Sequence, residues 1–122
     1  MANLTATNFD RARTLLAAGG PKVRVIGNNT TIEVNTYSDE DYGTEPVILV
    51  RLHGHGIVLL FANGDVAVRD CGYVTTTTYD RINAFLPAGY GASRRGGSGT
   101  LINRRTNERQ AISGQQWVRV AS

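Results

Sequence analysis

This sequence has little cysteine, no long apolar run and no basic N-terminal stretch, and each absence excludes a type of structure or a location. Only one of the 122 residues is a cysteine, Cys71, so an internal disulfide is excluded. The longest apolar run, Ile57–Ala62, has the length of a strand and falls far short of the roughly 18 to 20 residues that span a bilayer. The first residues lack a basic stretch followed by an apolar core, so we expect no secretory signal. Together these features predict a protein of the cytoplasm without a membrane partner.

The motifs of common enzyme classes are missing as well. The sequence has no nucleophile elbow, no phosphate-binding P-loop and no dinucleotide fingerprint. Serine and threonine are plentiful, but a nucleophile needs an oriented base, and the chain has only two histidines. We therefore predict a protein that is not an enzyme and that needs no cofactor.

The two histidines, His53 and His55, raise the question of a metal site. A His-x-His pair on a strand places both rings on one face, where they can chelate zinc, and Asp70 or Cys71 could add ligands. The flanking glycines favour a turn over a strand, and no Cys-x-x-Cys or third histidine supports the site. His53 and His55 are thus weak metal candidates, and we expect no metal.

The residues that are present predict one α+β domain over 1–122. Apolar residues make up 41% and charged residues 19%, as in ordinary globular domains. Continuous apolar runs at 47–50 and 57–61 are typical of central strands covered on both faces. Asn63-Gly64 between two apolar runs indicates a hairpin turn. The expected strands form a predominantly antiparallel meander and cover 23–26, 30–36, 47–50, 57–61, 65–69, 73–76, 100–103, 110–112 and 116–120.

Two short amphipathic helices are expected to pack on this sheet. Apolar residues recur at helical spacing in 8–19 and again in 78–89. Thr7 is the expected cap of the first helix, and the second is expected to begin near Thr77 or Thr78. The two segments align without gaps at an offset of 70. Either the helices share start and stop signals, or a helix–strand unit was duplicated and its second copy has degenerated.

Charge is distributed unevenly along the chain. The thirteen basic residues comprise one lysine and twelve arginines, and the formal net charge is +3. An expected loop at 37–46 is acidic, whereas an expected loop at 88–99 and the turn at 104–109 are rich in arginine. The pattern predicts two surfaces that bind partners of opposite charge, or each other in a homo-oligomer.

The arginine-rich segment 94–109 is the stronger binding signal. Arginine presents planar donor forks to phosphates, and neighbouring glycines let backbone N–H groups approach an anion. A tyrosine that precedes the segment could stack on a base. The alternatives are a solvated loop, contact with nucleic acid, or docking to an acidic protein surface. The candidate residues are Tyr90, Arg94, Arg95, Arg104, Arg105 and Arg109.

The acidic segment is a candidate protein interface. Two tyrosines lie within it, and tyrosine is enriched at interfaces. The alternative is a solvated loop whose tyrosines fold back on the sheet. The candidate residues are Tyr37, Asp39, Glu40, Asp41 and Tyr42.

Several short motifs occur together between Gly27 and Tyr90. They are GNNT at 27–30, RLH at 51–53, IV at 57–58, NG at 63–64, GYVTTT at 72–77, DRIN at 80–83 and LPAG at 86–89. In this combination, about half of the chain resembles a family of small proteins encoded by tailed phages of actinobacteria. The resemblance implies a phage origin and a location in the host cytoplasm. It carries over no functional residues.

Three interpretations of function follow. The first is a small phage accessory protein that acts by non-catalytic binding to a host or phage protein. The second is a nucleic-acid-binding protein that uses residues 94–109. The third is a structural protein of the virion, such as a minor capsid or decoration subunit.

Overall fold

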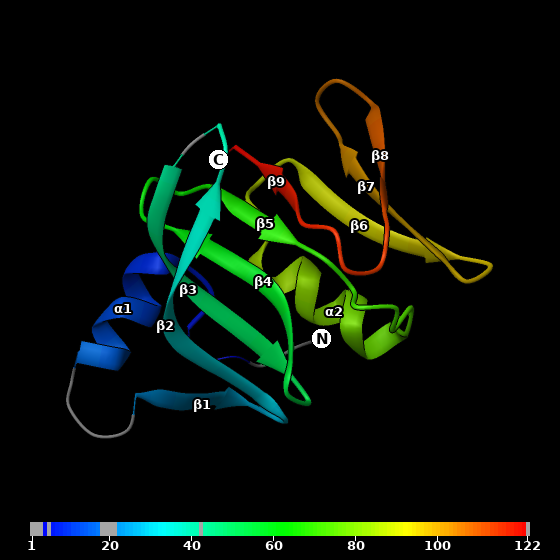
Figure 1. Ribbon diagram of the computed structural model, residues 1–122. Helices are drawn as coiled ribbons and strands as arrows, with labels where there is room; N and C mark the ends of the chain where they lie inside the picture. Colours follow the sequence, from blue (N-terminus) through cyan, green and yellow to red (C-terminus); the bar gives the residue numbers. More distant parts are fainter. Residues whose placement is uncertain (1–3, 5, 18–21, 42, 122) are drawn as a thin grey trace.

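In the residues that it describes, the structure has two helices and nine strands in two antiparallel sheets, which confirms the α+β class (Figure 1). The structure is a computed structural model that describes residues 4, 6–17, 22–41 and 43–121. In chain order the elements are α1 (Phe9–Ala17), β1 (Val23–Gly27), β2 (Thr30–Asp39), β3 (Gly43–Leu52), β4 (His55–Phe61), β5 (Val66–Val68), α2 (Thr76–Phe85), β6 (Tyr90–Arg95), β7 (Ser98–Asn103), β8 (Glu108–Ile112) and β9 (Val118–Val120).

The larger sheet has the strand order β1-β2-β3-β4-β5-β9. Its central strands β3 and β4 are buried on both faces, as their continuous apolar runs predicted. One face packs against both helices, since Ala12 of α1 and Ile82 of α2 belong to the same core cluster. The residues of β3 and β4 in that cluster are Ile48, Val50, Leu52, Ile57, Val58 and Leu60.

A second, smaller core lies on the other face of this sheet. It contains buried residues of β3, β4 and β5, and Tyr37 and Trp117 pack over them. The Arg119 guanidinium lies 3.7 Å from the centre of the Phe61 ring, and that of Arg69 lies 4.0 Å from the Trp117 ring. Aromatic and arginine side chains therefore cover the face that has no helix.

The expectation of an acidic loop over 37–46 is wrong. Strands β2 and β3 pair in register over ten residues, from Thr30 with Leu52 to Asp39 with Gly43. Pro46 pairs with β2 only, because the pairing of β3 with β4 begins at Val47. A proline, which has no N–H to donate, is tolerated at such a position because β3 has a neighbouring strand on one side only. The acidic residues therefore stand at the tip of a hairpin.

The expectation of a loop over 88–99 is also wrong. Residues 90–95 form β6, and Gly96 and Gly97 form a tight turn of positive φ before β7. Gly91 and Gly99 lie inside paired strands, where they make room for Arg104 and Tyr79. These glycines mark close approaches of side chains to a strand and do not mark a loop.

Three local expectations need smaller corrections. Residues 73–76 form no strand, because the chain turns after Asp70 and Thr75 caps α2, which begins at Thr76. The first helix is capped by Asn8 in place of Thr7, since the Asn8 side chain accepts from the Arg11 N–H at 2.9 Å. The turn that the glycines around the two histidines indicated ends before His55, where β4 already begins.

The helix similarity at an offset of 70 stays a prediction. Each helix is followed by an antiparallel hairpin, β1–β2 after α1 and β6–β7 after α2. The boundaries do not coincide at that offset, because α1 begins at Phe9 and α2 begins three residues before Tyr79. Residues 18 and 19, where the similarity includes two identities, lie outside the described residues.

Candidate functional site

The three-stranded sheet β6-β7-β8 carries most of the predicted basic site. We call residues 90–112 the basic sheet. Figure 1 shows its two hairpin tips extending away from the rest of the molecule. Its five arginines are all exposed, and Glu108 is its only acidic residue. The remainder of the chain holds eight basic and nine acidic residues, so the net positive charge of the protein resides in the basic sheet.

The strand register divides the predicted basic residues into two clusters. Tyr90 pairs with Asn103, so the turn with Arg104 and Arg105 lies at the end of the sheet where β6 begins, and Arg109 pairs with Ile102 beside it. Arg94 and Arg95 lie at the other end, opposite Gly99 and Ser98. Four to five residue steps along β6 separate the clusters, which corresponds to about 15 Å.

Glycines provide places for two of these arginines. A Cβ atom at Gly91 would lie 2.5 Å from Nη2 of Arg104, so the guanidinium lies directly on the strand. Gly89 has φ +92°, and a Cβ atom there would lie 3.2 Å from Nε of Arg105. At the other end, the Arg94 guanidinium donates to the hydroxyl of Thr76 on α2. Local packing therefore orients three arginines of the basic sheet.

Tyr90 does not form an exposed stacking surface. Its side chain is half-buried and packs against the main core. It also lines a polar groove of about 320 Å³ between the basic sheet and β9, together with Asn103, Arg109 and Arg119. The outer face of the sheet, opposite buried Leu101, includes Ser93, Thr100, Ile102 and Ala111, none of which is aromatic.

The predicted acidic interface is only partly exposed. Tyr37 packs edge-to-face on Phe61 with ring centres 5.7 Å apart, and its hydroxyl donates to Asp39 at 3.4 Å. Burial and the neighbouring Asp39 carboxylate raise the pKa of Tyr37 above its ordinary value. Glu40 and Asp41 are exposed at the hairpin tip, where the Asp41 N–H donates to Asp39 at 2.7 Å. Tyr42 lies outside the described residues.

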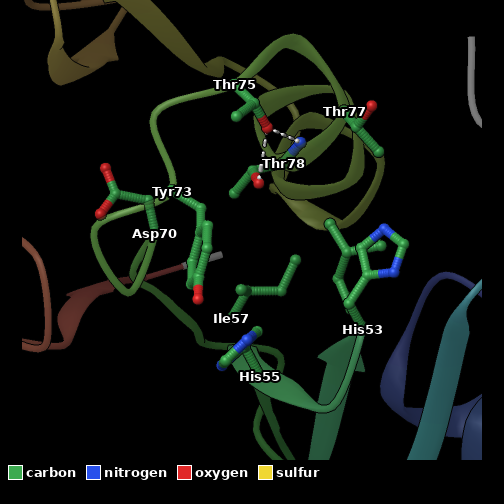
Figure 2. Close-up of a pocket in the computed structure, with 9 residues that line it drawn as sticks. His53, His55, Ile57, Asp70, Tyr73, Thr75, Thr77 and Thr78 are labelled. Atoms are coloured by element: carbon green, nitrogen blue, oxygen red, sulfur yellow. Dashed lines mark hydrogen bonds between the residues drawn. The ribbon is translucent and has the colours of Figure 1, made fainter.

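A pocket that the sequence did not predict lies where the β3–β4 turn meets the start of α2 (Figure 2). We call it the histidine pocket. Its volume is about 310 Å³, and buried Leu52 and Ile57 form its apolar floor. At its mouth the rings of His55 and Tyr73 lie with their centres 4.6 Å apart and their planes tilted by 36°. The pocket is lined by Leu52, His53, His55, Ile57, Asp70, Tyr73, Thr75, Thr77 and Thr78.

Buried hydrogen bonds fix the wall of this pocket. Asp70 is 1% exposed; one carboxylate oxygen accepts from the Tyr79 hydroxyl at 2.7 Å and the other from the Gly72 N–H at 2.9 Å. The Thr75 hydroxyl donates to that of Thr78 and also accepts from the Thr78 N–H, which caps α2. The Tyr73 N–H donates to the Asp70 carbonyl oxygen at 2.9 Å, so the backbone at Tyr73 is held beside the pocket although half of the residue's surface is exposed.

The two histidines do not form the strand pair that metal chelation would need. His53 adopts a left-handed φ of +51° in the turn, whereas His55 begins β4. Figure 2 shows the two imidazoles at different edges of the pocket, with Ile57 between them. No group of three His, Cys, Asp or Glu side chains within the described ranges could hold a metal ion.

The sequence offered a weak signal for this pocket. Within the motifs that carry the phage resemblance lie His53, Tyr73, Thr75 and Thr77, but nothing in their spacing places the β3–β4 turn beside α2. That contact depends on the tertiary fold.

A comparison with protein families identifies the chain's relatives. A family described as Kyanoviridae Gp96 protein matches residues 14–116, which is most of the chain. The chain belongs to the Kyanoviridae Gp96 family. This is a cyanophage family, so the expected phage origin is confirmed, and the expected actinobacterial host is not supported. The searches of curated proteins and of solved structures gave no match for this Gp96 relative. In the parts of the chain that the structure describes, no helix is long and apolar enough to cross a membrane.

Proposed function

We propose that this Gp96-family phage protein acts without catalysis in the host cytoplasm and that its basic sheet binds the phosphate backbone of double-stranded nucleic acid. The observation that carries the proposal is the concentration of the whole net positive charge in one projecting sheet. Phosphate neutralisation by arginine supplies most of the affinity of sequence-independent binding.

The spacing of the arginines favours a duplex. The two clusters lie about 15 Å apart, and the major groove of B-form DNA is about 12 Å wide, so each cluster can reach the phosphates of one strand. Small side chains at Ser93, Thr100 and Ala111 let the backbone approach closely. Proteins that bind single strands use exposed aromatic rings as stacking surfaces, and the outer face has none in the described residues.

A non-catalytic role is supported by the surroundings of the histidines. Within the described residues, neither imidazole hydrogen-bonds to a serine, threonine or cysteine side chain, whereas a nucleophile of this kind is activated by a base within hydrogen-bond reach. A protein partner is the second candidate function, and the observation that favours it is the histidine pocket. A virion structural role has no comparable observation in its favour.

The test is an electrophoretic mobility shift with a 20-base-pair DNA duplex at several salt concentrations. Arg94 faces α2 and donates to Thr76, so we count up to four phosphate contacts, and the slope of log affinity against log salt should reach about −3.6. Arg94→Gln/Arg95→Gln should therefore reduce the slope by about 1 and weaken binding regardless of DNA sequence. Arg104→Gln/Arg105→Gln, at the other end of the sheet, should reduce it by about 2.

The matched control is Arg11→Gln/Arg13→Gln. These two arginines are exposed on α1, outside the basic sheet, and their loss changes the net charge by the same amount. If the control lowers the slope as much as the sheet variants, binding follows net charge and the basic sheet is not the site. Tighter binding to a single strand than to the duplex contradicts the duplex proposal. A change of oligomeric state with salt, without DNA binding, indicates instead that the basic sheet binds the acidic hairpin of another copy.

A further inference from the structure

The histidine pocket is separate from the basic sheet, and it has the features of a recognition site for one side chain. Its floor, Leu52 and Ile57, is 4% and 1% exposed and wholly apolar. One wall is the pair of neighbouring, tilted rings of Tyr73 and His55. Pockets that bind ligands combine such an apolar interior with a few polar groups at the rim.

The shape of the pocket suits an aromatic ring. A ring can lie on the apolar floor and place its edge or face against the Tyr73 ring, the geometry that aromatic pairs prefer. Tyr73 is half-exposed, although most of the large apolar side chains in the described residues are packed away. Because the fold already holds Tyr73 in place, a partner that covers it loses little conformational entropy. Residues that dominate the binding energy of an interface are often ordered in this way before binding.

The polar rim favours a partner that accepts hydrogen bonds. His53, His55 and Thr77 are exposed at the rim, and each can donate a hydrogen bond. Asp70, the only carboxylate that lines the pocket, already accepts from Tyr79 and Gly72. A carboxylate that enters at the rim therefore meets donors and no exposed acidic group of the lining.

We propose that the histidine pocket binds an aromatic side chain of a protein partner, with a neighbouring acidic residue of that partner at the rim. The volume of about 310 Å³ lies at the lower limit for small-molecule sites, which span roughly 300 to 1,000 Å³. The pocket thus holds one ring and leaves the rest of the ligand outside. That is the way a side chain of a larger partner is anchored at an interface.

The experiment is an NMR titration of the ¹⁵N-labelled full chain with short peptides. Acetyl-Gly-Phe-Glu-Gly-amide should shift the amides of residues 52–57 and 70–78 in a saturable way, with a dissociation constant on the order of 1 mM. Acetyl-Gly-Ala-Glu-Gly-amide, which has no ring, should cause no saturable shift. Acetyl-Gly-Phe-Gln-Gly-amide, which has no carboxylate, should bind about tenfold more weakly.

Two variants test the location. Tyr73→Ala removes the aromatic wall, and Thr77→Trp adds bulk at an exposed position of the rim; both should abolish the shifts. Val25→Ala, at a valine that is 73% exposed on β1, is the control and should bind as the unaltered protein does. Because the amide spectrum reports folding directly, Thr77→Trp still decides the matter if Tyr73→Ala unfolds the chain.

Several outcomes overturn the proposal. Equal binding of the alanine peptide excludes a ring site, and shifts that map outside 52–57 and 70–78 place the binding elsewhere. Tighter binding of free phenylacetate than of the Phe-Glu peptide makes the pocket a site for small aromatic acids. None of these results bears on the salt dependence of DNA affinity measured with the arginine variants. The pocket proposal and the DNA proposal can therefore fail independently.

Discussion

The side-chain amide of Asn83 hydrogen-bonds to the backbone of Ala92 in the way that a neighbouring strand would. Asn83 Oδ1 accepts from the Ala92 N–H, and Asn83 Nδ2 donates to the Ala92 carbonyl oxygen, both at 2.8 Å. The same Nδ2 also donates to the carbonyl of Tyr79 within α2, at 2.9 Å. One side chain of α2 thus satisfies the open edge of β6 and fixes the basic sheet to the helix.

Replacing Asn83 should loosen the basic sheet. Asn83→Ala removes three hydrogen bonds at a partly solvated site, so we expect the free energy of unfolding to fall by about 1–2 kcal/mol. Asn83→Asp keeps the acceptor and loses both donated bonds, so its cost should be similar. Urea unfolding measures the change, and faster amide exchange at Ala92 shows that the edge has opened. An unchanged exchange rate at Ala92 would contradict this role.

Gly99 should tolerate no side chain. A Cβ atom at this position would overlap the Tyr79 hydroxyl and part of its ring, which is buried between α2 and β7. Gly99→Ala should therefore destabilise the protein by about 3 kcal/mol. Thr100→Ala, one residue along the same strand on the outer face, is the control and should cost much less. The comparison needs only thermal or urea unfolding of the two variants.

The protein should lose stability in alkaline solution through Tyr79. Burial and the hydrogen bond to the Asp70 carboxylate raise the pKa of Tyr79 well above its ordinary value of 10. The unfolded chain releases this proton near pH 10, whereas the folded chain retains it. The stabilisation is therefore complete below pH 10 and declines as pH rises toward the folded pKa, by up to about 1.4 kcal/mol per pH unit.

Tyr79→Phe isolates this effect. The variant should be less stable at neutral pH, because one oxygen of the buried Asp70 carboxylate loses its partner. Its unfolding free energy should decline less steeply above pH 10 than that of the unaltered protein. Urea unfolding between about pH 8 and pH 11 gives both curves. Parallel curves would mean that Tyr79 does not retain its proton in the folded state.

Arg119 should stabilise the second core by two separable means. Its guanidinium pairs with Glu45 at 2.7 Å and with Asp65 at 2.9 Å, and it lies over the Phe61 ring. These partners raise the pKa of Arg119, led by the hydrogen bond to Glu45. We expect Arg119→Ala to cost about 2–3 kcal/mol, since two carboxylates lose their partner and Phe61 loses its cover.

Arg119→Met separates the ion pairs from the packing. Methionine keeps an apolar chain over Phe61 and removes the charge, so this variant should lie between the native protein and Arg119→Ala in unfolding free energy. Equal losses for the two variants would assign the whole effect to the ion pairs. High salt should reduce the difference between the native protein and Arg119→Met.

Hydrophobic pattern predicted the centre of this fold. The runs 47–50 and 57–61 became the doubly covered strands β3 and β4, because burial on two faces demands a continuous apolar stretch. Residue composition gave a wrong prediction of secondary structure where a tertiary contact decides the conformation. Gly91 and Gly99 resemble loop residues in the sequence, yet each lies in a strand because a distant side chain, Arg104 or Tyr79, occupies the space beside it.

The candidate sites divide in the same way. The five arginines were identifiable from charge alone, but only the register of β6 and β7 separates them into two clusters. Tyr37 folds back on Phe61 because the hairpin of β2 and β3 extends beyond its expected end. The histidine pocket depends on the contact between the β3–β4 turn and the start of α2, which no local pattern encodes.

The pairing of β5 with β9 has a kinetic consequence. Val66–Val68 and Val118–Val120 are neighbours in the sheet, and about fifty residues, which include α2 and the basic sheet, separate them along the chain. Closing so long an excursion costs conformational entropy before three residue pairs compensate for it. We therefore expect β9 to dock late in folding and to be among the first strands to open in the native state. The second core, which Arg119 covers from β9, would then be exposed transiently while the helix-covered core stays intact.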